Sequence, residues 1–240
     1  MITFRKLKEA LEYVLGSKMG SNEGGIHKDT ETGKQHYIKY YKNPDQAKTE
    51  VLTSKIYNHM GIHTLNPEYK NINGKHAVVT DFNPHLERIK PHEFSKLPKS
   101  SHHQLGKMYH AAVLTKNWDV VGLEHDNIMK HKHTGNLHSI DTGGSFNFRA
   151  MGGHKPYGSD IAEHDTLRNR PYEPSSEVFS HTFANHPEAE HEGLKAVKSM
   201  DMEHVHHLFK TSGISNWKDL HSNFVKRREN LISHYKGKSK

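Results

Sequence analysis

The sequence of 240 residues contains no cysteine. Disulfide bonds, cysteine-based zinc sites and thiol nucleophiles are therefore excluded, and a reducing compartment is compatible with the chain. Long hydrophobic runs are also absent. No stretch approaches the roughly 18 apolar residues that a membrane-spanning helix needs, and residues 1–16 lack the apolar centre of a secretory signal. Only 32% of the residues are hydrophobic and the mean hydropathy is −0.90, so we expect a cytoplasmic protein with a modest core.

The chain also lacks an excess of negative charge. Lysine and arginine number 34 against 27 acidic residues, which gives a net charge of +7 before any of the 24 histidines is protonated. Such a balance favours anionic partners such as a nucleotide, an acidic lipid or membrane surface, or nucleic acid, although it also serves solubility. The basic residues are scattered and are not interleaved with aromatic ones, so nucleic acid is the least favoured of these partners.

The pattern of apolar and turn residues predicts an α+β protein with two lobes. In the first part we expect a helix over Phe4–Leu15, a glycine-rich loop over Gly16–Gly25, a strand over His36–Tyr41, a helix over Asp45–Met60 and strands over Glu68–Ile72 and His76–Phe82. A connector rich in Pro, Lys and Ser follows at residues 83–101. We therefore predict a small β-rich N-lobe over residues 1–83 and a larger, mainly helical C-lobe over residues 84–240.

Within the second part we expect a helix over His103–Leu114, a loop over Asn117–Asn127, short strands at residues 128–129 and 137–140, a glycine-rich irregular segment over Asp141–Pro174 and mostly helices from Ser175 on.

The first lobe offers candidate groups for binding nucleotide phosphates. In the glycine-rich loop these are Gly20, Ser21, Asn22 and Gly24. Their backbone N–H groups are placed to approach phosphate oxygens, but a plain flexible turn explains the glycines too, and no P-loop pattern follows. Lys39, in the next predicted strand, would hold the phosphates, and Glu50 in the following helix would pair with it. Taken alone, Lys39 fits a solvent-facing strand lysine better, and Glu50 fits a surface position equally well.

The second lobe has polar side chains at the ends of its two short strands. Asn127 precedes the first strand and Asp141 follows the second, so a hairpin brings both to one edge. An amide oxygen beside a carboxylate suits Mg²⁺. Asp119, in the loop before, is our preferred base for orienting an acceptor hydroxyl, with Asp126 as the alternative. A phosphate cover, a lysine, a metal pair and a base are the parts that phosphoryl transfer needs.

The segment Gly122–Phe146 resembles the catalytic and metal-binding loops of phosphoinositide-kinase-like enzymes and is similar to those of HipA-type and CotH-type atypical kinases. The matching residues are Asn127-Ile-Met129, Gly135-Asn-Leu137 and His138-Ser-Ile-Asp141-Thr-Gly-Gly144. The resemblance implies a two-lobed protein-kinase-like fold, ATP and Mg²⁺ as cofactors, Asn127 and Asp141 as metal ligands and Asp119 as the catalytic acceptor. CotH-type kinases also place a Trp-Asp pair ahead of the metal Asn, as this chain does at Trp118-Asp119.

The sequence departs from these families before Asn127. Their catalytic triplet lies closer to the metal Asn, whereas Asp119 lies eight positions before Asn127 and position 122 is glycine. The expected activity is transfer of the γ-phosphoryl group of ATP to a protein hydroxyl, by a minimal kinase of the phage or bacterial effector type, delivered into a host cytoplasm if it is an effector. A phosphoinositide or small-molecule kinase, an adenylyl transferase and a non-catalytic pseudokinase stay open as alternatives.

Four basic residues follow the metal-binding loop, in the place of an activation segment. They are Arg149, Lys155, Arg168 and Arg170. We expect them to receive a phosphorylated peptide or a lipid headgroup, and a mobile loop with no partner fits this stretch equally well.

Overall fold

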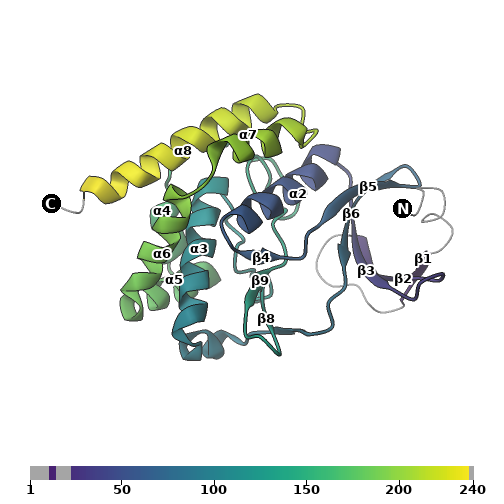
Figure 1. The fold of residues 1–240 in the computed structure, drawn as a ribbon, viewed down its shortest axis with the longest axis horizontal. Helices are drawn as coiled ribbons and strands as arrows, with labels where there is room; N and C mark the ends of the chain where they lie inside the picture. Colours follow the sequence, from purple (N-terminus) through teal and green to yellow (C-terminus); the bar gives the residue numbers. More distant parts are fainter. Residues whose placement is uncertain (1–10, 15–22, 238–240) are drawn as a thin grey trace.

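The computed structural model describes residues 11–14 and 23–237. Its N-terminal part is an antiparallel sheet with the strand order β1-β2-β3-β6-β5 (Figure 1). The strands are β1 (Leu11–Tyr13), β2 (Glu23–Asp29), β3 (Gln35–Tyr41), β5 (Glu68–Ile72) and β6 (Lys75–Asp81). The strands predicted over His36–Tyr41, Glu68–Ile72 and His76–Phe82 are confirmed, each to within a residue at its ends.

The helix predicted over Phe4–Leu15 is wrong where the structure describes it. Leu11–Tyr13 forms strand β1, in which Leu11 pairs with Asp29 and Tyr13 with His27; Phe4–Ala10 and Leu15 lie outside the described residues. A helix shorter than about 12–15 residues is marginal by itself. Pairing with β2 therefore outweighs the helical spacing of the leucines.

Helix α2 (Pro44–His59) packs against this sheet. It starts with a capped turn, because the side chain of Asn43 accepts a hydrogen bond from the N–H of Asp45, at 2.9 Å, and Pro44 occupies the first helical turn. It ends before Gly61, whose φ of +73° allows the chain to turn sharply. The helix predicted over Asp45–Met60 is therefore confirmed to within a residue at each end, and it carries Glu50 on its buried face.

A second sheet has the order β4-β9-β8-β7. Its strands are β4 (His63–Thr64), β7 (Leu86–Arg88), β8 (Ile128–His131) and β9 (Leu137–Ser139). The β8–β9 hairpin confirms the predicted strand pair, whereas β4 and β7 are too short to show a periodic pattern. Because β4 pairs in parallel with β9, this sheet joins residues on both sides of position 83. The division into lobes at that position stays a prediction.

Helices make up most of the remaining described chain. They are the 3₁₀ helix η1 (Pro91–Lys96), α3 (Lys99–Thr115), α4 (Glu163–Asn169), α5 (Pro174–Asn185), α6 (Pro187–Lys198), α7 (Met202–Thr211) and α8 (Trp217–Gly237). Helix α3 is central and buries apolar side chains along its whole length, including Leu105, Met108 and Val113. Glycine at position 106 lets α6 approach closely, since a Cβ there would lie 1.9 Å from the carbonyl oxygen of Ala189.

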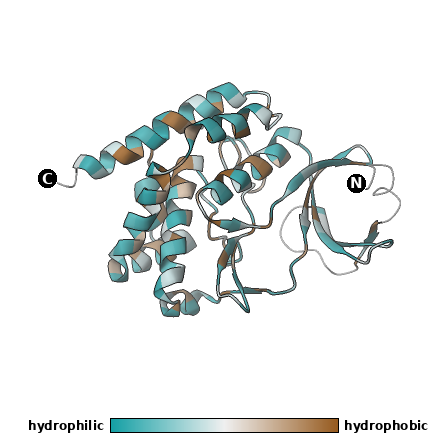
Figure 2. Cartoon of the chain, in the orientation of Figure 1, coloured by the Kyte–Doolittle hydropathy of each residue, from teal (hydrophilic) through white to brown (hydrophobic). Residues whose placement is uncertain are grey.

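Hydropathy follows the same arrangement. The helical ribbons alternate between hydrophobic and hydrophilic stretches, as expected for helices with one buried face (Figure 2). The prediction of an irregular segment over Asp141–Pro174 is wrong at Glu163–Asn169, which forms helix α4 because its buried face, with Leu167, packs against α3 and α5. Within residues 11–14 and 23–237, no helix combines the length and the apolar character that crossing a membrane requires.

Candidate active site

Lys39 and Glu50 form a buried ion pair between strand β3 and helix α2. The Nζ atom of Lys39 lies 2.8 Å from Oε1 of Glu50, and the two side chains are 12% and 3% exposed. Burial raises the pKa of Glu50, although the charge of Lys39 acts against that shift. Burial alone would lower the pKa of Lys39, but Asp141 and Glu50 together raise it above its ordinary value. Lys39 therefore stays protonated, and its two carboxylate partners hold it in a fixed position.

Tyr41 completes the environment of Glu50. It lies two residues after Lys39 on β3, which places both side chains on the same face of the sheet. Its buried hydroxyl donates a hydrogen bond to Oε2 of Glu50. Burial and the nearby carboxylates of Glu50 and Asp141 raise the pKa of Tyr41 well above its usual range, so the hydroxyl stays protonated as a donor. Sequence reasoning missed Tyr41, although the two-residue spacing from Lys39 was a usable signal.

Asp141 connects the loop after β9 to the same lysine. Its Oδ2 lies 3.0 Å from Nζ of Lys39, and its Oδ1 accepts a hydrogen bond of 3.0 Å from the N–H of Gly143. The next residue, Thr142, is buried, and its hydroxyl donates to the backbone carbonyl of Glu50 at 3.0 Å. Helix α2, strand β3 and the loop after β9 therefore meet at one point.

Asn127 and Asp119 lie together at the start of strand β8. The Nδ2 atom of Asn127 donates to the carbonyl oxygen of Asp119 at 2.6 Å and lies 3.3 Å from its Oδ2. The carbonyl of Asn127 accepts the N–H of Ile140, at 3.0 Å, so Asn127 sits beside the residue that precedes Asp141. Since the NH₂ group is engaged with Asp119, the Oδ1 atom of the amide is left as an acceptor or ligand.

The carboxyl group of Asp119 lies in an environment that disfavours its charge. Burial raises its pKa to about 6, with additional repulsion from Asp141 and Asp126, while Asn127 and Lys155 act in the opposite direction. A carboxylate with this pKa is mostly ionised at neutral pH and remains a better proton acceptor than an ordinary aspartate.

The alternative base, Asp126, is exposed. It belongs to the tight turn around Gly122, which has φ +83°, and a Cβ at position 122 would lie 2.3 Å from Oδ1 of Asp126. Glycine there is a requirement of the turn. The choice between Asp119 and Asp126 stays a prediction, and the contact with Asn127 favours Asp119.

The glycine-rich loop is described only at its end. Gly20, Ser21 and Asn22 lie outside the described residues. Gly24 pairs with Lys39 across the β2–β3 ladder, and a Cβ on Gly24 would lie 2.0 Å from the carbonyl oxygen of Ile38. Close approach of the two strands therefore explains this glycine, and its role in phosphate binding stays a prediction.

The donor atoms at the site fit a hard divalent cation. Asn127 offers an amide oxygen and Asp141 a carboxylate, and Mg²⁺ typically takes one or two protein oxygens and keeps several waters. A zinc-type site is not seen, since no three His, Cys, Asp or Glu side chains in the described part of the chain are grouped to hold a metal ion. The residues present therefore suit Mg²⁺ bound together with phosphates.

The four basic residues expected to receive an anionic ligand have different environments. Arg168 pairs with Glu190 at 2.6 Å, and Lys155 is buried and donates to two backbone carbonyls. The expectation of a shared anion site is wrong for these two, because their charged groups are already used within the fold. Arg149 and Arg170 are exposed.

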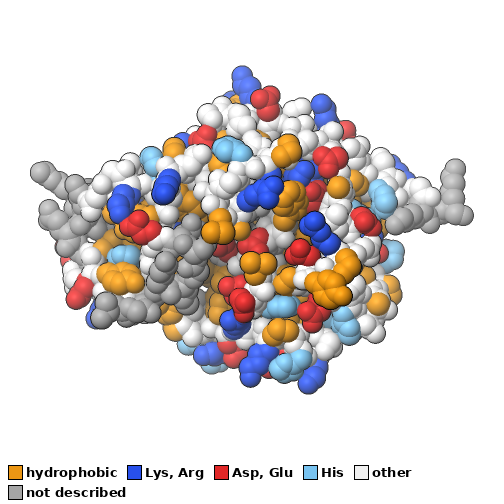
Figure 3. Space-filling model, turned by 180° about the vertical axis from the view of Figure 1, so that it is seen from behind, with side chains coloured by type: hydrophobic (Ala, Val, Ile, Leu, Met, Phe, Trp, Pro, Cys, Tyr) orange, Lys and Arg blue, Asp and Glu red, His pale blue; other side chains and the backbone are white. Residues whose placement is uncertain are grey.

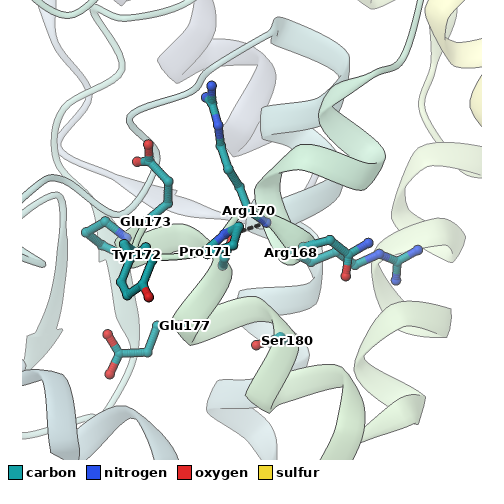
Figure 4. Close-up of a pocket in the computed structure, with 10 residues that line it drawn as sticks. Arg168, Arg170, Pro171, Tyr172, Glu173, Glu177 and Ser180 are labelled. Carbon is teal, nitrogen blue, oxygen red and sulfur yellow. Dashed lines mark hydrogen bonds between the residues drawn. The ribbon is translucent and has the colours of Figure 1, made fainter.

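A cavity of about 530 Å³ lies between α4 and α5 (Figure 4). It is lined by Arg168 and Arg170 but by none of the predicted catalytic, nucleotide-binding or metal-binding residues. Arg168 extends to one side of it, and Tyr172, Glu173 and Glu177 lie on the other. On the face seen in Figure 3, Lys and Arg side chains are interspersed with acidic ones and histidines and do not gather into one patch.

The architecture is that of the kinase-like fold, with an antiparallel sheet followed by a mainly helical part and a lysine, an asparagine and an aspartate at their junction. Among solved structures, the crystal structure of a Helicobacter pylori proinflammatory kinase, CtkA, is similar, with a TM-score of 0.59 over 93% of this chain and 94% of that chain. The identity is 13%, so the likeness shows the fold alone. The predicted fold class is confirmed. No protein-family model matches the sequence, and no curated protein matches it either.

Proposed function

We propose that the protein is a phosphotransferase that uses ATP and Mg²⁺ to phosphorylate a hydroxyl group of a protein. The observation that carries the proposal is the position of Lys39, whose Nζ lies 2.8 Å from Glu50 and 3.0 Å from Asp141. A buried lysine held between two carboxylates keeps its charge and its geometry, and phosphate oxygens need both. The kinase-like fold supports the same function.

Each residue has a role that follows from its contacts. Lys39 binds the α- and β-phosphates, and Glu50 and Tyr41 fix its direction. Asp119 orients the acceptor hydroxyl and takes its proton on a carboxylate oxygen, for which an ionised group near neutral pH is required. Asn127 holds Asp119 in place through its NH₂ group.

Asn127, through Oδ1, and Asp141, through its carboxylate, would hold Mg²⁺. The cation would supply positive charge that neutralises the phosphate oxygens during transfer. Asp141 also contacts Lys39, so the metal ligand and the phosphate-binding lysine are positioned by one network.

The test is transfer of label from ATP to casein, to a basic protein and to the chain itself. Label at the γ-phosphate should appear in protein, whereas label at the α-phosphate should not. Transfer of α-label would instead establish adenylyl transfer. Asp119→Asn should lower turnover about 10²- to 10⁴-fold, the range of general-base contributions. Asp126→Asn is the matched control and should keep most activity; the reverse result would move the base to Asp126.

A further inference from the structure

Lys155 is a buried lysine that the roles above do not use. It is 4% exposed, which is unusual for a lysine whose charge is not matched by a direct carboxylate partner. Its ammonium donates to the carbonyl oxygens of Lys116, at 2.5 Å, and Gly144, at 2.7 Å. Lys116 precedes the loop that carries Asp119, and Gly144 belongs to the loop that carries Asp141. One ammonium group therefore joins the two loops.

The same ammonium lies against Trp118, the residue before Asp119. Its Nζ is 4.6 Å from the centre of the indole ring, a distance at which the ring attracts a cation. The ring is held from another direction, because its Nε1 donates to Oε1 of Glu163 at 2.9 Å. Glu163 in turn forms an ion pair with the fully buried Arg227. Lys155 and Glu163 thus hold the Trp118 ring, and with it the loop that carries Asp119, in place.

Lys155 also acts on Asp119 through its charge, which lowers the pKa of that carboxyl against the larger effect of burial. Its own pKa is lowered to about 7, mainly by burial. Glu163 of α4 opposes this shift, and Lys116, Arg149 and Arg227 of α8 contribute to it. Lys116 and Arg149 also lie over the Trp118 ring, at 5.8 and 5.4 Å.

We propose that Lys155 is a positioning residue, whose ammonium joins the loop of Asp119 to the loop of Asp141 and holds the two carboxylates in one arrangement. This inference rests on the proposed function. Loss of the charge removes two charge-assisted hydrogen bonds and the contact with Trp118, so the base moves relative to the nucleotide while the Lys39–Glu50 pair stays intact.

The first test compares Lys155→Met, Lys155→Arg and, as a matched control on the surface of α6, Lys195→Met. Lys155→Met should lower kcat by about 10- to 100-fold, the effect of a small misplacement of reacting groups, with KM for ATP little changed. Lys155→Arg should restore much of kcat. The wild type should lose kcat as pH rises through about 7, where the ammonium deprotonates, and in Lys155→Arg this decline should move to higher pH because arginine stays charged.

Equal kcat in Lys155→Met and Lys195→Met, or a decline above pH 7 that Lys155→Arg does not move, would overturn the proposal.

A second measurement needs no turnover. In a Trp217→Phe background Trp118 is the remaining tryptophan, since the chain has two. Its fluorescence should change with a midpoint near pH 7, and this transition should vanish in the Lys155→Met form. A wild type that is inactive but shows the fluorescence transition would refute only the proposed phosphotransferase activity. A wild type that is active but lacks the transition would refute the role of Lys155.

Discussion

At the residue scale, Glu50 receives Lys39 on one carboxylate oxygen and the hydroxyl of Tyr41 on the other. A search for kinase motifs, which looks for Lys and Glu alone, does not find the contact between Tyr41 and Glu50. It matters because a buried carboxylate with an unsatisfied oxygen loses the stabilisation of its charged form. Tyr41 is therefore part of the same unit as the ion pair.

Tyr41→Phe tests this unit. The ring volume is kept, but Glu50 loses one donor, so the free energy of unfolding should fall by about 1–3 kcal/mol, the cost of leaving a buried acceptor unpaired. Urea denaturation measures the change. Tyr13→Phe is the control, since Tyr13 is exposed, and its effect should stay within about 0.5 kcal/mol. Equal stability of the two variants would show that the Tyr41 hydroxyl contributes nothing.

Asp119 leads to a prediction about pH. Burial, with Asp141 and Asp126 nearby, raises its pKa to about 6. The ionised form accepts the proton, so kcat/KM should fall about tenfold per pH unit below that pH. This acid limb is separate from the loss of rate above about pH 7 that the deprotonation of Lys155 causes. A rate profile from pH 5 to 8 measures this. An acid limb near the ordinary aspartate value of about 4 would contradict the assignment of Asp119 as the base.

At the scale of elements, helix α2 is attached to the loop after β9 by the hydroxyl of Thr142, which donates to the carbonyl of Glu50 at 3.0 Å. Thr142→Val removes the hydroxyl at nearly constant volume, and Thr142→Ser keeps it. We expect α2 amides to exchange with deuterium about fivefold faster in the valine variant, as loss of roughly 1 kcal/mol implies. The serine variant should resemble the wild type. Equal exchange in both variants would mean that other contacts hold the helix.

Much of this arrangement was predictable from local sequence. Asn43 and Gly61 delimit α2, and turn residues separate β5 from β6 and β8 from β9. Asn127 and Asp141 were placed at one edge by the hairpin between them, and the contact of Lys39 with Glu50 followed from the order of strand and helix. These features depend on neighbours in the chain, which is why a pattern reveals them.

The remainder depends on contacts between distant segments. Strand β4 forms only because β9 lies beside it, and Leu11–Tyr13 is a strand because β2 offers an open edge. Lys155 looked like a surface ligand for anions, yet it is buried against Lys116, Gly144 and Trp118. Its hydrogen-bond partners lie 11 and 39 positions away in the sequence, and no spacing rule links them.

At the scale of the whole molecule, the C-terminal helices are tied to helix α2. The Nζ atom of Lys48 donates to the carbonyl of Gly213 at 2.7 Å, and the hydroxyl of Ser215 donates to Asp45 at 2.6 Å. Near the other end of α2, the N–H of Asp201 donates to Nε2 of His59 at 3.0 Å. The position of Glu50 is thus supported from the sheet on one side and from α7 and the segments that flank it on the other.

Two histidines with lowered pKa values, the buried His102 and the half-buried His138, make the stability of the whole chain depend on pH. Burial lowers the pKa of His102 to about 4, helped by His186 and His181, and that of His138 to about 4, helped by His63 and His131. The unfolded chain protonates near the ordinary value of about 6.5, so it binds more protons than the folded chain between these limits. The stability that His102 and His138 contribute is fully present above about pH 6.5 and is lost as the pH falls toward about 4.

Urea unfolding at about pH 7.5 and pH 5 tests this statement. The midpoint should be lower at pH 5. His102→Phe keeps a ring in contact with His186 and removes one titrating group, so the difference between the two midpoints should shrink. His191→Gln is the control, because His191 is exposed, and it should leave the difference unchanged. A midpoint that does not respond to pH would contradict the lowered pKa values of His102 and His138.

Lys39, Asn127 and Asp141 are proposed to form one site for Mg²⁺ and ATP, and thermal unfolding with both ligands is the direct test of this site. At about 100 times its dissociation constant, the ligand should stabilise the wild type by about 2.7 kcal/mol. The shift should require Mg²⁺ and should be lost in Asp141→Asn and Lys39→Met, while Asp126→Asn retains it. No shift in the wild type, or an equal shift in every variant, would contradict the claim.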